Sequence, residues 1–221
     1  MTKKQKHPEK VTTDLIIVGP MPFPWKSLKT YLNNPDSKLI FIDGGIKHWE
    51  KFKKKAPQLL KTSMTVGDGD SSRKVMTLKK VSQNTSDLGV LLSKLGKKSE
   101  HARFMLVGFL GGRLDHQLFN LGEITLFLKK FNQANSPSIC MDDKIQFLSA
   151  GIHHVCIDGI FSLAGFEPGS IKIEGNCEYT SKNWLKLPTM SSQGLSNLGQ
   201  GEIKISTKTP LMIIKNLLNG N

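Results

Sequence analysis

The sequence predicts a mixed α/β fold, with an N-terminal, mostly parallel α/β domain at 14–138 and a C-terminal antiparallel β-sandwich domain at 139–221. In the first part, short apolar runs of strand length alternate with helical segments, which is typical of a parallel sheet with crossover helices. In the second part, short β-rich runs are separated by Gly, Pro, Ser and Asn, which is typical of antiparallel strands. Polar clusters follow the apolar runs of the first part, and such sheets bind ligands beyond the carboxyl ends of their strands.

The first three strands are expected in short apolar runs of the N-terminal part. The first is Asp14 to Gly19, the second is Lys38 to Ile42, and the third ends in an acidic stretch at Asp68. Continuous apolar runs of this length indicate strands that are buried on both faces. Helices are expected between them, over Trp25 to Leu32 and in a lysine-rich segment that ends near Ala56.

A fourth strand is expected at Phe104 to Gly108, between two helices. Ser86 is a favourable N-cap for the helix before it, and Asp87 would favour the positive end of that helix. The helix after it carries apolar residues from Leu118 to Leu128. In the C-terminal part the β-rich runs are Ile145 to Leu148, Val155 to Ile157, Phe161 to Ala164, Ile171 to Ile173, Ile203 to Ser206 and Leu211 to Ile214.

Composition narrows the class of protein. The 221 residues are 38% hydrophobic and 22% charged, as in ordinary globular proteins, and the formal net charge is +13. Such a charge attracts polyanions, but only Arg73, Arg103 and Arg113 are arginine, the residue that specific phosphate and base contacts favour. No zinc-finger, RRM or basic-zipper pattern is present in the sequence, so we expect no nucleic-acid partner.

The cysteines and the lengths of the apolar runs indicate the cellular compartment that we expect for the protein. Cys140, Cys156 and Cys177 are too widely spaced for a C-x-x-C metal site, and three cysteines fit no disulfide framework. A reducing compartment is therefore expected. No apolar run of the sequence approaches the ~18 residues of a membrane helix, so we expect a cytoplasmic protein without a membrane partner.

The stretch from Thr65 to Ser71 contains two carboxylates, Asp68 and Asp70, two residues apart. In an extended segment these side chains point the same way, and two ionised carboxylates that close need a cation between them. Mg²⁺ is the expected ion, since it takes oxygen ligands and leaves room for substrate phosphates. The alternative is a polar turn, because Gly, Asp and Ser are also common turn residues.

Three further polar clusters accompany the acidic stretch, and glycine loops, helix N-termini and an arginine are suited to binding phosphates. Together the four clusters predict a nucleotide and metal site for phosphoryl transfer. The three further clusters consist of Asp43, Gly44 and Gly45, of Gln83 and Asp87, and of Gly111, Gly112, Arg113, Asp115 and His116. A salt bridge between Arg113 and Asp115, and a helix cap at Gln83, are the alternatives for those residues.

The order of these clusters resembles the thiamine pyrophosphokinase family, whose pattern is D-G-G, G-D-x-D-S, a D-Q-D-x-T-D-like segment, G-G-R-x-D-H and S-N. The matching residues are Asp43 to Gly45, Gly67 to Ser71, Gln83 to Asp87, Gly111 to His116, and Ser196 with Asn197. The resemblance implies a homodimeric enzyme with an α/β catalytic domain and a β-sandwich domain. It implies transfer of diphosphate from ATP to the hydroxyl of thiamine, which yields thiamine diphosphate and AMP.

The resemblance also implies roles for individual residues. Asp68 and Asp70 would hold Mg²⁺ on the triphosphate, with Asp87 and Asp115 completing the acidic set and Arg113 contacting phosphates. Residues expected to bind the nucleotide or the vitamin are Asp43, Gly44, Gly45, Ser71, Gln83, Gly111, Gly112, Ser196 and Asn197. Ser196 and Asn197 would help form the vitamin pocket and would face the other subunit.

The chain departs from the family pattern at Ser82 and Asn84, where carboxylates are usual. Fewer carboxylates weaken metal binding or change its geometry. Two alternatives therefore remain beside a thiamine diphosphokinase. One is a diphosphokinase for another small alcohol such as a pterin, and the other is a catalytically weakened nucleotide-binding protein.

Overall fold

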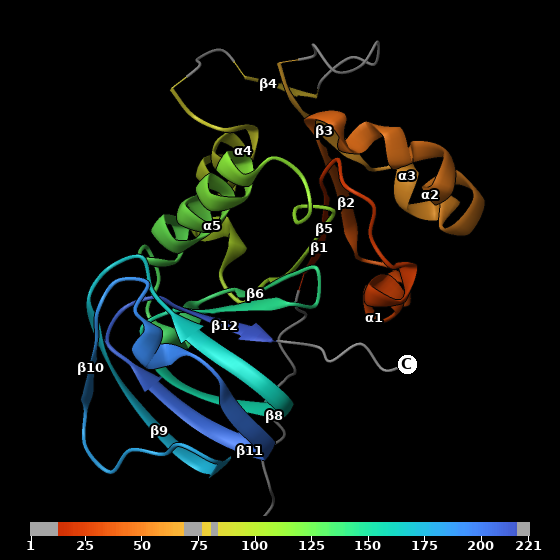
Figure 1. Ribbon diagram of the computed structural model, residues 1–221. Coiled ribbons are helices and arrows are strands. Elements are labelled where there is room, and N and C mark those ends of the chain that lie inside the picture. Colours follow the sequence, from red (N-terminus) through yellow and green to blue (C-terminus); the bar gives the residue numbers. More distant parts are fainter. Residues whose placement is uncertain (1–12, 69–76, 81–83, 216–221) are drawn as a thin grey trace, which may run out of the picture.

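The computed structural model describes residues 13–68, 77–80 and 84–215 (Figure 1). Within these residues, twelve strands form one hydrogen-bonded sheet in the order β10-β9-β11-β8-β12-β7-β6-β5-β1-β2-β3-β4. The N-terminal strands are β1 (Asp14–Val18), β2 (Lys38–Ile42), β3 (Met64–Gly67), β4 (Leu78–Lys79), β5 (Arg103–Val107) and β6 (Ser138–Met141). The C-terminal strands are β7 (Ile145–Leu148), β8 (Gly151–Ala164), β9 (Gly169–Cys177), β10 (Leu185–Leu187), β11 (Asn197–Thr207) and β12 (Leu211–Lys215).

The α-helices all lie in the N-terminal part of the described chain. They are α1 (Lys29–Leu32), α2 (Trp49–Lys55), α3 (Pro57–Leu60), α4 (Asp87–Leu95) and α5 (Leu114–Leu128). Short 3₁₀ helices lie at Trp25–Leu28, Asp43–His48, Gly96–Ser99, Gln133–Asn135 and Ser192–Gly194. No helix among the described residues is long and apolar enough to cross a membrane.

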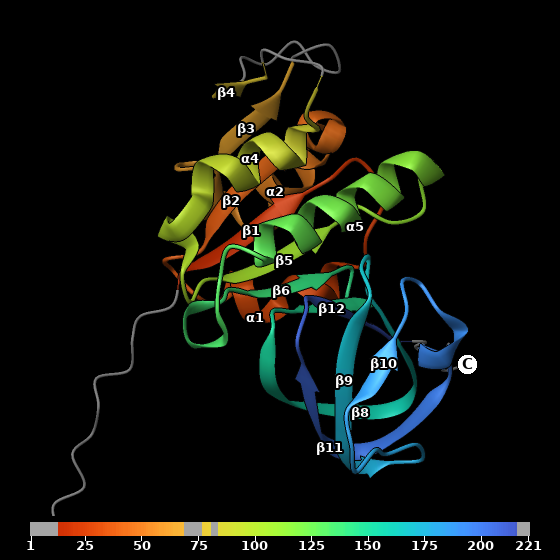
Figure 2. The same cartoon turned by 90° about the vertical axis from the view of Figure 1, so that its left-hand side faces the viewer.

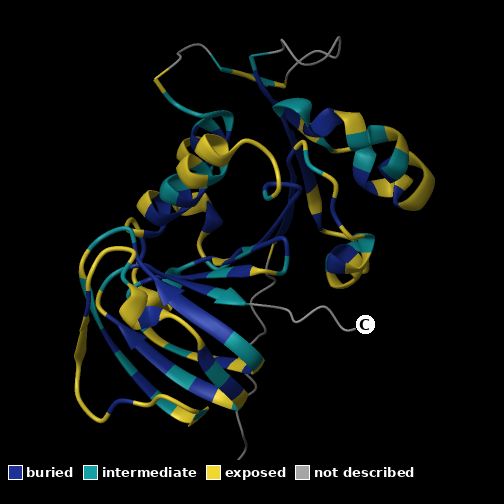
Figure 3. Ribbon diagram, viewed as in Figure 1, coloured by how far each residue is buried: buried dark blue, intermediate teal, exposed yellow. Residues whose placement is uncertain are grey.

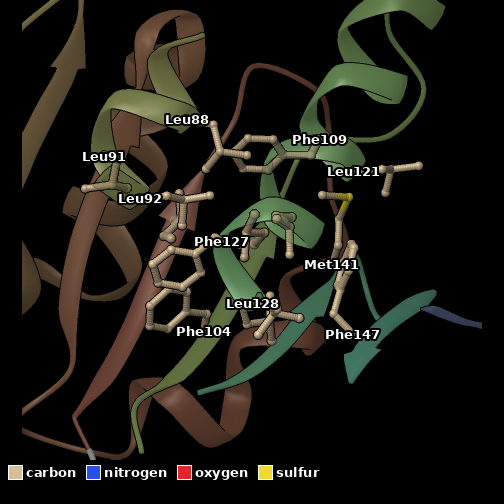
Figure 4. Packing of buried hydrophobic residues seen from close by; sticks show 14 of the residues in the cluster. Leu88, Leu91, Leu92, Phe104, Phe109, Leu121, Phe127, Leu128, Met141 and Phe147 are labelled. Carbon is tan, nitrogen blue, oxygen red and sulfur yellow. The ribbon is translucent and has the colours of Figure 1, made fainter. Parts of the chain in front are cut away.

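Helices cover both faces of the N-terminal strands, with α4 and α5 on one side and α1, α2 and α3 on the other (Figure 1). Side chains of a strand alternate between its two faces, and this divides the core into two clusters. Leu15 and Ile17 of β1 belong to the cluster under α4 and α5, which also contains Leu92 and Phe127 (Figure 4). Their neighbours in β1 belong to a second cluster, with residues of α2 and α3. The predicted strands that are buried on both faces are therefore confirmed.

The C-terminal strands curve around a core of their own (Figure 2). This core is made of apolar side chains that alternate along the strands, among them Val155 and Ile157 of β8 and Ile203 and Ile205 of β11. The same strands expose polar residues on the outer surface, so that buried and exposed positions alternate along them (Figure 3). This pattern explains why an alternating sequence folds into half-buried antiparallel strands.

One hydrogen-bonded sheet runs through both predicted domains, so their separation into an α/β domain and a sandwich domain stays a prediction. Among the described strands, β6 pairs in parallel with β5 and antiparallel with β7, and so joins the two halves. The five parallel pairings all lie among β1–β6, as expected for the α/β part. The six other pairings are antiparallel, so the sheet as a whole is mostly antiparallel. The predicted boundary at 138/139 falls at the start of β6.

Candidate functional site

The carboxyl ends of the parallel strands surround a cavity of about 320 Å³, which we call the first cavity. Its lining includes Asp43 after β2 and Gly108 after β5. Asp87, in the first turn of α4, and Arg113, just before α5, also line it. These residues come from three segments that are far apart in the sequence, namely the end of β2, the start of α4 and the loop between β5 and α5, and the parallel sheet brings them together as predicted.

Asp43 begins the first of the predicted polar clusters and has a left-handed backbone, with φ of 41°. Its Oδ1 atom is buried and has no hydrogen-bond partner among the described residues. A buried carboxylate oxygen without a donor is costly, which indicates that a ligand or cation completes this site. Gly45 also has a packing role, because a Cβ there would clash with the carbonyl oxygen of Val18. Gly45 therefore lets the turn pack on β1.

The loop after β5 is held in place by one buried carboxylate that the sequence analysis missed. Asp142, just after β6, accepts hydrogen bonds from the backbone N–H groups of Gly108 (2.6 Å), Phe109 (3.0 Å) and Leu110 (2.9 Å). Burial raises the pKa of the Asp142 carboxyl, although these three hydrogen bonds act in the opposite direction. The signal that could have found it is an acidic residue directly after a buried apolar run, the same signal that marks Asp43.

Gly111 and Gly112, predicted to cradle phosphates, form the next part of this loop. The N–H of Gly111 donates to Oε1 of Gln117 (3.2 Å), and the side chain of Gln117 donates back to the carbonyl of Gly112 (2.9 Å). Gly111 has φ of 91°, a conformation that favours glycine. Gln117 thus fixes the turn that leads into α5, and in this conformation the N–H of Gly111 is already used.

Arg113 and Asp115 form the salt bridge that was the alternative for this pair. The guanidinium donates from Nε (3.1 Å) and from a terminal nitrogen (2.5 Å) to the two carboxylate oxygens of Asp115. Both side chains are largely exposed, and the hydrogen bonds from Arg113 lower the pKa of Asp115 to about 2. Asp115 is therefore ionised at neutral pH and is a weak proton acceptor. The N–H of His116 also donates to Asp115, at 2.9 Å, which ties the pair to the start of α5.

The acidic stretch lies only partly within the described residues. Asp68 directly follows β3, whereas Asp70, Ser71 and Gln83 lie outside the described residues. Among the residues that the structure describes, no group of three or more His, Cys, Asp or Glu side chains is placed to hold a metal ion. The predicted metal pair of Asp68 and Asp70 stays a prediction.

A second cavity of about 680 Å³ lies next to the first, and the two share Lys80, Ser86, His116 and Asn120 in their linings. Apolar and aromatic side chains of α5 and of the segment after β8 also line the second cavity, together with one carboxylate. These residues are Leu118, Phe119, Leu126, Phe166 and Glu123. The hydroxyl of Ser86 accepts from the N–H of Gly89 (2.9 Å), so the predicted N-cap is confirmed at the point where the cavities meet.

Ser196 and Asn197 lie in the C-terminal half and line neither of these cavities. Both polar atoms of the Asn197 side chain bond to the backbone of Tyr179, at 3.0 Å and 2.8 Å. Ser196 is exposed and has φ of 59°, and its N–H donates to the hydroxyl of Ser162 (3.1 Å). Within one chain, Asn197 therefore holds a turn, and Ser196 presents its side chain to the surface.

Comparison with known proteins finds a known catalytic domain in the part of the chain that lines the first cavity. The family model for the catalytic domain of thiamin pyrophosphokinase matches residues 29–136, which contain all the residues of the first cavity except Pro20 and Met21. No curated protein sequence is significantly similar to the chain.

Solved structures share the whole fold. Thiamine pyrophosphokinase from Bacillus subtilis is 19% identical, with a TM-score of 0.72, over 94% of this chain and 100% of its own. Thiamin pyrophosphokinase from Candida albicans is 12% identical, with a TM-score of 0.70, over 92% of this chain and 90% of its own. The enzyme from Geobacillus thermodenitrificans is 18% identical, with a TM-score of 0.67, over 93% of this chain and 99% of its own. Residues 29–136 therefore match the catalytic domain of the thiamine pyrophosphokinase family, and the chain as a whole shares the fold of these enzymes.

Proposed function

We propose that the first cavity binds the triphosphate of ATP and that the second cavity binds thiamine. From the match to the catalytic domain we infer that the chain is a thiamine diphosphokinase, which transfers diphosphate from ATP to the hydroxyl of thiamine and releases AMP. The observation that carries the assignment of the site is the unpaired, buried Oδ1 of Asp43, in a cavity that also contains Asp87 and Arg113. The linings of the two cavities meet, as an in-line transfer between two substrates requires.

A divalent cation fits the chemistry of this cavity, because the carboxylates of Asp43, just after β2, and of Asp87, at the start of α4, line it with hard oxygen atoms. We propose Asp68 and Asp70 as the residues that hold Mg²⁺, with Ser71 and Gln83 next to the phosphates. When bound, Mg²⁺ neutralises charge on the triphosphate and orients it.

Arg113 is proposed to contact the phosphates once a nucleotide enters. In the structure its guanidinium is paired with Asp115 and is 72% exposed, so the side chain can turn towards the cavity that it lines. Asp115 is proposed to complete the acidic set, beside the phosphates that Arg113 contacts. Asp87 lies in the first turn of α4 and also lines the first cavity. We therefore propose that the attacking hydroxyl lies near Asp87.

The second cavity suits the vitamin because it combines ring-binding surface with negative charge. Phe119 and Phe166 offer aromatic faces that can cover a pyrimidine ring. Glu123 offers a carboxylate that attracts a thiazolium cation, even in a protein whose net charge is +13. The helix face towards this cavity is apolar but open, with Phe119 69% exposed and Leu126 58% exposed.

A symmetric dimer would cover this open face and bring Ser196 to the thiamine site. Two sets of exposed apolar side chains support the dimer, one on α5 with Leu114 and Phe119, and one on the C-terminal half with Tyr179, Trp184 and Leu195. In a two-fold assembly the first set of one chain can pack on the second set of the other. The C-terminal part at 139–221 would then serve as the acceptor-binding and dimer domain for the catalytic part at 14–138. A cytoplasmic site of action is proposed as well, since Cys140, Cys156 and Cys177 are all free thiols.

We expect the chain to form a dimer in solution. Light scattering across the micromolar range should give about twice the chain mass of 24.5 kDa. Phe119→Asp should shift the mass towards the monomer, because a charge would be buried in an apolar contact. The control is Asp158→Asn, which changes the charge at an exposed position of β8. This variant should leave the dimer intact. A monomer with full activity would reject the shared site.

The function is tested by a product assay with ATP, Mg²⁺ and a panel of alcohols that contains thiamine. We expect thiamine diphosphate and AMP in equal amounts, since diphosphate transfer makes one of each. If thiamine yields no AMP but a pterin alcohol or another acceptor does, thiamine is rejected as the acceptor. The assignment as a diphosphokinase is then retained. ATP binding with no AMP from any alcohol would favour the weakened nucleotide-binding protein.

A further inference from the structure

We propose that Lys80 binds the diphosphate group that is transferred, both in ATP and in the product. The proposal rests on the proposed function and adds a residue that lies in no cluster of the family pattern. Lys80 lines the first cavity and the second cavity, so its side chain lies where the two meet.

The sheet fixes the place of Lys80. Strands β3 and β4 are parallel, with Val66 opposite Leu78 and Gly67 opposite Lys79. The backbone N–H of Lys80 continues this ladder by donating to the carbonyl of Gly67, at 2.9 Å. Lys80 therefore lies beside Asp68, the first residue after β3, and at the same edge of the sheet as the other candidate residues.

The ammonium group of Lys80 lies in an environment that favours the binding of an anion. Only 12% of its side chain is exposed, and its ion-pair partner is Asp87, whose Oδ1 is 3.7 Å from Nζ. Among the described residues, Nζ has no hydrogen-bond partner, although an ammonium carries three donors. An enclosed cation with unused donors, next to a cavity for a polyanion, is suited to bind phosphate oxygens.

The position also indicates which phosphates it binds. In the transfer, AMP leaves from one side of the reacting phosphorus and the acceptor hydroxyl attacks from the other. The group that lies between the two substrates is the diphosphate, and it stays with the acceptor after the reaction. A cation shared by both cavities contacts this group before and after transfer, and does not contact the phosphate of AMP.

The test compares Lys80→Met with Lys79→Met by calorimetric binding of ATP, AMP and thiamine diphosphate, in EDTA and in Mg²⁺. Lys79 is the adjacent residue of the same type and is exposed, so its variant controls for loss of one positive charge. We expect Lys80→Met to weaken ATP and thiamine diphosphate binding by about 10- to 100-fold, as for loss of a charged hydrogen bond. AMP binding should stay unchanged, and Lys79→Met should bind all three ligands as the wild type does.

Lys80→Arg keeps the charge and should retain most of the ATP affinity, which separates a phosphate contact from a role in folding alone. Thermal unfolding of all three variants shows whether the fold is intact. Equal loss of AMP and ATP affinity in Lys80→Met, or no loss of either, would overturn the proposal. These outcomes concern binding, so they are distinct from a failure of the wild type to form thiamine diphosphate, which would reject the proposed function.

Discussion

Asp68→Asn is expected to lower kcat by at least about 100-fold, the usual effect of removing one group that stabilises charge in a transfer reaction. Asp68 follows β3 at the edge of the sheet where Asp43 and Asp87 line the first cavity. At the proposed metal site, loss of this charge would leave the cation with one carboxylate fewer and the triphosphate poorly neutralised. Asp70→Asn is expected to have an effect of the same size. Steady-state kinetics at saturating ATP and thiamine measure both.

Asp158→Asn is the control for these variants, since Asp158 is exposed on β8 and lines neither cavity. It should keep wild-type kinetics. All three proteins should unfold at nearly the same temperature, because none of the changes removes apolar packing. Full turnover in both Asp68→Asn and Asp70→Asn would remove the metal pair from the mechanism.

The fold of the N-terminal half was predictable because its strands are buried on both faces. A run such as Lys38 to Ile42 contains four apolar residues in a row, and the structure places a strand at those five positions. Sequence reasoning failed where pairing depends on contacts across the sheet. The two residues of β4 carry no apolar run, and their strand exists only because they pair with β3. Likewise, only the pairing of β6 on both sides shows that the sheet is continuous.

Site residues could be predicted where a polar residue directly follows a strand or begins a helix in the sequence. The polar residues after β2 and β5 and at the start of α4 lie around one cavity, since parallel strands end at the same edge. The roles of Gly45, Gly111 and Asn197 were not predictable in this way. Each of them is decided by a contact partner, namely Val18, Gln117 and Tyr179, that lies elsewhere in the chain.

Asp142 is another residue whose role is decided by contacts with a distant part of the chain. Among such residues, its substitution is expected to have the largest effect on activity. One carboxylate accepts three N–H groups, from Gly108, Phe109 and Leu110, in the loop that leads to Arg113. The loop has no regular secondary structure at these residues, so this carboxylate replaces the hydrogen bonds that a helix or strand would supply. We infer that Asp142 is a positioning residue, because it would act on the proposed phosphate site through the loop.

Asp142→Asn is expected to lower kcat/KM by about 100-fold, the effect of misplacing a substrate-binding loop by about 1 Å. The free energy of unfolding should fall by about 1–3 kcal/mol, since the amide group leaves at least one buried N–H without an acceptor. Asp143→Asn is the matched control: both residues have a left-handed backbone, with φ of 50° and 56°, and both changes remove one charge. Asp143 accepts none of the three N–H groups, so its variant should resemble the wild type.

The dependence of kcat/KM on pH distinguishes a positioning role of Asp142 from a general loss of stability. Burial raises the pKa of Asp142, so on acidification it takes up its proton at a higher pH than an exposed aspartate does. The wild type should therefore lose kcat/KM as the pH falls through that raised pKa, because a protonated carboxyl accepts fewer hydrogen bonds from the loop. Asp142→Asn has no proton to take up there, and its low kcat/KM should stay flat over the same range. A variant that keeps the wild-type acid limb would show that another group causes it and that Asp142 does not position the loop.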